Sequence, residues 1–154
     1  MMLLILGALV QATSLPPQTW KERNHPDMSL LPACNLGGSA PVIERMADLP
    51  RTVAAELTRL FAPDVISEAD GPFNSTDVVG GNVPIRRFIR AYHVGSDWIV
   101  WYELGGGRVA GLRTIALHAR NERRTIMAEH GTTFAGDLCA ASKAIVAGVR
   151  TARP

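Results

Sequence analysis

Two cysteines, Cys34 and Cys139, restrict how this chain can fold, because a bond between them would tie its first part to its last. They follow an apolar run at residues 3–10, far shorter than the roughly 20 apolar residues of a membrane span. The run suits the apolar core of a secretory signal peptide, although no Lys or Arg precedes it. Residues 10–12 supply small residues at the positions that a signal peptidase recognises, so cleavage would follow Ala12. We expect a signal peptide over residues 1–12; the alternative is an ordinary apolar element in a cytosolic protein.

Export would place the chain in an oxidising compartment, which favours a disulfide between Cys34 and Cys139. The mature protein is therefore expected to be periplasmic or secreted, with no membrane span after cleavage of the signal. Residues 13–40 are rich in Pro, Asn, Ser and Gly and predict an irregular arm. A bridge from this arm would close a loop of about 100 residues, worth roughly 4–5 kcal/mol in the chain-entropy model.

Composition predicts one folded domain and excludes several classes of protein. Hydrophobic residues make up 47% of the 154, which is too many for a disordered chain. The net charge of +2 is too small to indicate a nucleic-acid partner. Acidic residues gather in residues 40–79 and arginines in residues 83–125. This asymmetry indicates either an acidic helix beside a basic sheet edge or a basic face for an anionic partner.

Hydrophobic periodicity predicts a single α+β domain over residues 41–150, followed by a tail at 151–154. Spacings of three and four indicate a helix over residues 41–61, which Pro50 should kink or divide, and another helix over 134–149. Between them, β-branched and aromatic residues predict a four-stranded antiparallel meander sheet, packed by the N-terminal kinked helix and the C-terminal helix. The expected strands are 85–94, 97–104, 108–120 and 123–130. One further short strand is possible between residues 64 and 84.

One face of the predicted sheet mixes aromatic residues with arginines and places Arg90 opposite Trp101. It is interpreted either as a sheet surface that is covered or satisfied within the chain, or as a binding face. Trp, Tyr and Arg are frequent anchors of protein interfaces. The candidate partner-binding residues are Arg90, Tyr92, Trp101 and Arg113. A shift of one residue in the strand register would exchange the two faces.

The chemical motifs are sparse, and no cofactor, metal site or catalytic residue is predicted. No two of the four histidines stand at metal-ligand spacing, and the chain has no G-x-S-x-G turn. Two functional classes remain. The first is a non-enzymatic binding or accessory protein, for example an inhibitor or immunity-type protein, with an envelope protein, a secreted protein or an anionic ligand as its partner. The second is a small periplasmic hydrolase that uses Asp77, His93 or Glu103.

Overall fold

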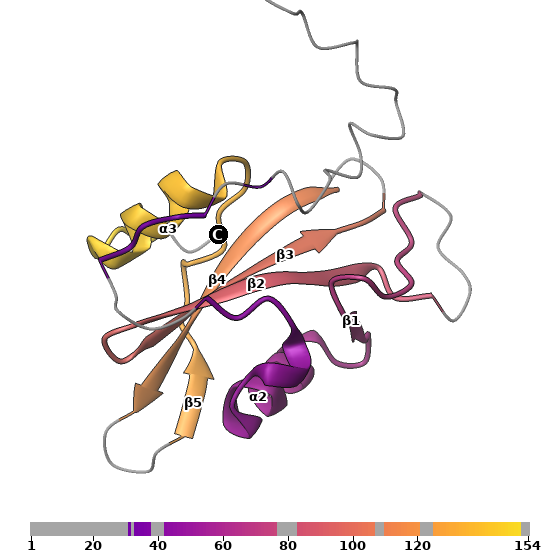
Figure 1. Cartoon of the computed structure of the whole chain (residues 1–154), viewed down its shortest axis with the longest axis horizontal. Helices are drawn as coiled ribbons and strands as arrows, with labels where there is room; N and C mark the ends of the chain where they lie inside the picture. Colours follow the sequence, from indigo (N-terminus) through magenta and orange to yellow (C-terminus); the bar gives the residue numbers. More distant parts are fainter. Residues whose placement is uncertain are drawn as a thin grey trace, which may run out of the picture.

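The computed structural model is an α+β fold in which a five-stranded mixed sheet curls into a half-barrel (Figure 1). Helix α2 (Arg51–Phe61) packs on one face of the sheet, and helix α3 (Leu138–Val146) packs on the other. The structure describes Leu31 and residues 33–37, 42–76, 83–106, 110–120 and 125–151. The predicted signal peptide, most of the predicted arm and residues 152–154 lie outside these ranges.

The sheet contains the predicted antiparallel meander and one additional strand. Its strands follow chain order: β1 (Ile66–Ser67), β2 (Arg86–Val94), β3 (Asp97–Leu104), β4 (Gly111–Arg120) and β5 (Thr125–Ala128). Strands β2 to β5 pair antiparallel, as predicted, whereas β1 pairs parallel with β2. The expectation of four strands, all antiparallel, was therefore wrong at this edge. A strand of two residues is too short to show an alternating pattern.

The predicted N-terminal helix is divided rather than kinked. Pro50 is the N-cap of α2, with φ −53° and ψ 139°, and within residues 42–49 the helical part is the three-residue 3-10 helix η2 (Met46–Asp48). Proline disfavours the helical conformation of the residue before it, and Leu49 is extended accordingly. The helix predicted to start at residue 41 was wrong for its first residues, because Ile43 instead forms an antiparallel β-bridge with Ala91.

Helix α2 lies in the curve of the sheet and contacts both edge strands, β1 and β5. Its apolar residues recur every four positions, so they form one stripe that faces the sheet. This stripe, Leu49 and the facing strand residues form the first core: Leu49, Val53, Leu57, Phe61, Ile66, Phe88, Ala91, Val100, Tyr102, Ile115 and Leu117. The apolar stripe thus explains why the edges of the sheet curl toward this helix.

A β-bulge in β2 allows the opposite face of the sheet to be apolar as well. Phe88 lies opposite Tyr102 and Arg90 lies opposite Trp101, so Ile89 is the extra residue. Ile89 consequently faces α3 and joins the second core, whereas Phe88 stays in the first. The second core contains Ile89, Tyr92, Ile99, Trp101, Ala116, Leu138 and Ile145.

A buried hydrogen bond fixes α3 on the sheet. The indole N–H of Trp101 donates to Ser142 Oγ at 2.8 Å, and Ser142 Oγ donates to the carbonyl of Leu138 at 2.7 Å. Both side chains are fully buried. Asp137 is the N-cap of the helix, and its carboxylate accepts the backbone N–H of Ala140 at 2.9 Å. These contacts set both the start of the helix and its position over β3.

The Ser142 contact can be tested by mutation. Ser142→Ala leaves the buried indole N–H of Trp101 without a partner, so we expect the free energy of unfolding to fall by about 1–3 kcal/mol. In a Trp101→Phe background the same change should cost less, because no N–H remains to be satisfied. Urea unfolding of the four proteins measures the coupling. Lys143→Ala, on an exposed neighbour in the same helix, is the control. Equal losses in both backgrounds would contradict the assignment.

Glu56 joins α2 to the edge strand β5 and is only 6% exposed. Its carboxylate accepts two hydrogen bonds from Arg59, at 2.6 and 2.7 Å, and the backbone N–H of Ala128 at 2.8 Å. The amide of Glu129 bonds inward to Ala116 of β4, so the amide of Ala128 points out of the sheet. Glu56 therefore accepts a hydrogen bond from a backbone amide at the edge of the sheet, where no further strand pairs with β5. The Arg59 hydrogen bonds lower the pKa of Glu56, burial opposes this, and the Ala128 amide lowers the pKa further.

Glu56→Gln should destabilise the protein by about 1 kcal/mol at pH 7, since Arg59 is exposed and the pair is partly screened. The pKa of Glu56 lies below its ordinary value of 4.5 in the folded protein. Its contribution is therefore present above that value and is lost as the pH falls. Urea unfolding at pH 7 and at acid pH should show the difference from wild type shrinking on acidification. Asp70→Asn, on an exposed loop, is the control. A difference that grows on acidification would refute this role.

Candidate functional site

Three of the predicted partner-binding residues lie together beneath α3. Trp101 is 1% exposed, Tyr92 is 5% exposed and Arg90 is 8% exposed. The rings of Tyr92 and Trp101 lie 4.9 Å apart between centroids, and the Arg90 guanidinium lies 5.5 Å from the Trp101 ring. The pairing of Arg90 with Trp101 agrees with the predicted register. In this fold Tyr92 and Trp101 belong to the second core, and the Arg90 guanidinium packs on the Trp101 ring. Partner binding through these three residues stays a prediction.

Arg113 is separated from this group because it lies on the opposite side of the sheet. It pairs with Tyr102, a member of the first core, and its Nη1 donates to the carbonyl of Leu112 at 2.9 Å. The predicted common face of Arg90 and Arg113 was therefore wrong. The prediction assumed a three-residue turn, whereas Leu104 pairs with Gly111 and leaves six residues between them. The observed connection is three residues longer than the predicted one. Because side chains alternate along a strand, this odd difference places each β4 residue on the face opposite to the predicted one.

Cys34 and Cys139 lie at disulfide distance, as predicted, with their Cα atoms 5.4 Å apart. Their pairing attaches residues 33–37 to α3 along the second core (Figure 1). The backbone N–H of Cys34 also donates to Tyr92 Oη at 3.2 Å, and Leu31 and Leu36 pack against the same core. These contacts place the described part of the arm over Tyr92.

The residues proposed for hydrolase chemistry have other contacts in the fold. Asp77 lies outside the described residues. The His93 ring stacks on Trp98 at 4.6 Å between centroids. Glu103 is buried and forms an ion pair with Arg87 at 2.5 Å, and the Arg87 guanidinium lies over the Phe73 ring. The hydrolase interpretation gains no support from these contacts.

The acidic and basic segments of the chain meet at the surface of the fold. Arg86 of β2 forms an ion pair with Asp64 at 2.6 Å, and Arg90 lies 4.0 Å from Glu44. In each pair the acid comes from the segment around α2 and the arginine from the sheet. This arrangement favours the interpretation of the charge asymmetry as a helix segment packed beside a basic sheet edge.

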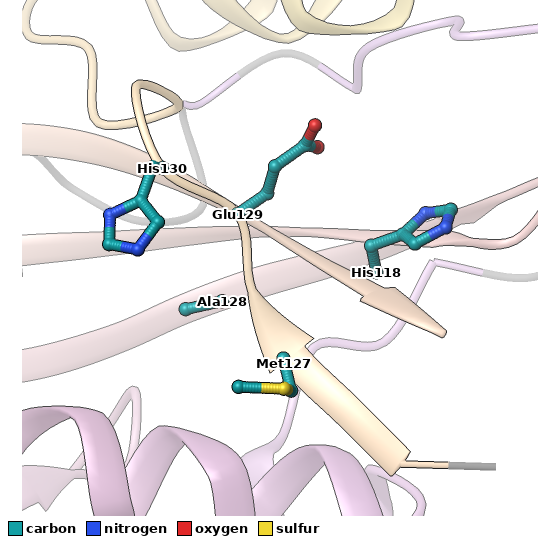
Figure 2. A pocket seen from close by; sticks show the side chains of 5 residues that line it. All are labelled: His118, Met127, Ala128, Glu129 and His130. Atoms are coloured by element: carbon teal, nitrogen blue, oxygen red, sulfur yellow. The ribbon is translucent and has the colours of Figure 1, made fainter. Parts of the chain in front are cut away.

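A pocket of about 390 Å³ lies at the β4–β5 end of the sheet. It is lined by His118, Met127, Ala128, Glu129 and His130 (Figure 2). His118 of β4 pairs with Met127 of β5 across the ladder, and the rings of His118 and His130 point to opposite sides. Glu129 is held by Arg150 through two hydrogen bonds, at 3.0 and 2.9 Å. The half-exposed side chain of His118 and the exposed Met127 are therefore the pocket residues that a ligand can reach together.

Asp97 orients the imidazole of His118. Its Oδ1 atom contacts His118 Nδ1, and Ser96 Oγ lies 3.5 Å from the same nitrogen. In a Ser-His-Asp triad the serine and the carboxylate contact different ring nitrogens, so these three residues do not form one. The carboxylate holds Nδ1 as a donor and leaves Nε2 for a ligand. Sequence reasoning missed this pair, because Asp97 meets His118 only in the observed register of β3 and β4.

Among the residues that the structure describes, no three His, Cys, Asp or Glu side chains gather as a metal site. No helix in the described ranges is both long enough and apolar enough to cross a membrane. Comparison of the chain with models of protein families, with curated proteins and with solved structures finds no match.

The cysteine pairing gives a direct prediction. The purified, exported protein should have an intact mass lower than that of the reduced chain by two hydrogen atoms, and it should not react with a thiol-alkylating reagent under denaturing conditions. Reduction before alkylation should then label both Cys34 and Cys139. Two thiols labelled without reduction would disprove the bridge.

Proposed function

We propose that this chain is an exported, non-enzymatic binding or accessory protein whose ligand occupies the pocket at the β4–β5 end of the sheet. The N-terminal apolar run and the cysteine pair at disulfide distance support export to the periplasm or the exterior. The observation that carries the binding site is the oriented His118 imidazole beside the exposed Met127 side chain. A pocket that joins an apolar wall to a few fixed polar groups is the usual form of a ligand site.

The composition of the pocket favours a small carboxylate with an apolar tail. Met127 offers apolar contact on the same face as His118, and the thioether of methionine adapts to ligands of different shape. His118 offers Nε2 as a hydrogen-bond donor to the carboxylate when the imidazole is protonated, while Asp97 holds the other nitrogen. Glu129 does not oppose an anion strongly, because Arg150 pairs with its carboxylate.

Hexanoate is a suitable probe of this site. We expect hexanoate to shift the methyl NMR signal of Met127 in a saturable manner, and His118→Ala to weaken this binding by about tenfold through the loss of a charge-assisted hydrogen bond. His93→Ala, which removes a histidine outside the pocket, is the matched control and should bind as the wild type does. No saturable shift, or equal affinity in His118→Ala, would refute the site. Turnover of the p-nitrophenyl ester of hexanoic acid that depends on His118 would instead favour a hydrolase.

A further inference from the structure

The two cysteines are unequally accessible, although they are partners. Cys34 is 6% exposed and lies between Tyr92 and α3, whereas Cys139 is half-buried in the first turn of α3, beside the exposed Ala140. An attacking thiolate must approach one sulfur of a disulfide, so access decides which sulfur is attacked. The exposed fractions of the two residues therefore favour Cys139 as the side from which an external thiolate reaches the bond.

Within the described residues, few contacts other than the bridge join the segment that carries Cys34 to the domain. Apart from the bridge, Cys34 donates its N–H to Tyr92, the Leu31 carbonyl accepts from Arg90 Nη1 at 3.4 Å, and Leu36 packs on the second core. Helix α3 is held independently, by the buried Ser142 contact and by Arg150, which joins the end of the helix to Glu129. Loss of the bridge should therefore free residues 33–37 while α3 stays in place.

We propose that Cys139 is a site of thiol–disulfide exchange with a dithiol oxidoreductase, and that exchange there releases residues 33–37 from α3. This goes beyond ligand binding at the pocket and does not depend on it. The described part of the arm, Leu31 and residues 33–37, is then a strap that covers Tyr92 and Arg90. The strap is bonded to α3 only while the cysteine pair is oxidised.

The exchange consists of two balanced steps. A thiolate of the oxidoreductase forms a bond with Cys139 Sγ, the bond between Cys34 and Cys139 breaks, and its electron pair leaves on Cys34 Sγ, which takes a proton from water. The second thiolate of the oxidoreductase then attacks the oxidoreductase sulfur of the mixed disulfide and expels Cys139 as a thiolate, which takes a second proton from water. The chain gains two electrons and two protons, and the oxidoreductase becomes a disulfide.

Trapping of the intermediate tests the first step. The oxidised full chain is incubated with a thioredoxin-type oxidoreductase whose second active-site cysteine is replaced by serine, and the mixed disulfide is mapped by peptide mass analysis. We expect the adduct on Cys139 in preference to Cys34 by more than about ten to one. The same oxidoreductase with both cysteines replaced is the control. An adduct on Cys34, equal adducts on both cysteines, or no adduct would overturn the proposal.

Hydrogen exchange tests the release of the strap. The chain is reduced by the intact oxidoreductase, alkylated with iodoacetamide, and compared with the oxidised chain. The amide of Cys34 should exchange at least about tenfold faster after reduction. The amide of Ala141, which bonds to the Asp137 carbonyl within α3, is the internal control and should be unchanged. An unchanged exchange rate at Cys34 would overturn the proposed release of the strap. Equal acceleration of exchange at Cys34 and Ala141 would also overturn it, because the bridge would then stabilise the whole domain.

Discussion

Burial of β3 on both faces is the constraint on which the rest of this structure depends. Val100 faces α2, while Ile99 and Trp101 face α3, and all three are at most 1% exposed. Each such side chain contributes roughly 1.5–3 kcal/mol when it is removed from water, so neither face of the central strand can remain uncovered. Helices on both sides of the sheet, the bulge in β2 and the buried Trp101–Ser142 contact all follow from this requirement.

Local patterns in the sequence predicted the elements better than their faces. The limits of β3 were predicted without error, because turn residues flank a dense run of β-branched and aromatic residues. The faces were predicted poorly because they depend on two details that no local pattern reveals. One is the extra residue at Ile89, and the other is the six-residue connection before Gly111. The bridge between Ile43 and Ala91 is equally non-local, since it depends on a free position at the edge of β2.

The candidate sites likewise include one feature that the sequence could predict and others that depend on the strand register. The pairing of Cys34 with Cys139 could be predicted, because the chain offers no other thiol. The contact of Asp97 with His118 could not, because it needs the register of two strands. Arg90, Tyr92 and Trp101 indicated an interface by residue type, yet the properties that anchor an interface also suit a core. Large aromatic surfaces and arginine stems are buried in both settings, so composition alone does not separate them.

The position of the cysteine pair has a mechanical consequence. Cys34 and Cys139 enclose the whole sheet and α2 within one covalent loop, with Cys34 before the loop's elements in the sequence and Cys139 after them. With the bond formed, a pulling force on the two ends would pass from one segment to the other through the sulfur atoms, and the strands between them would bear no load. The disulfide would then shield the sheet from tension, whereas the part of α3 that follows Cys139 would stretch first.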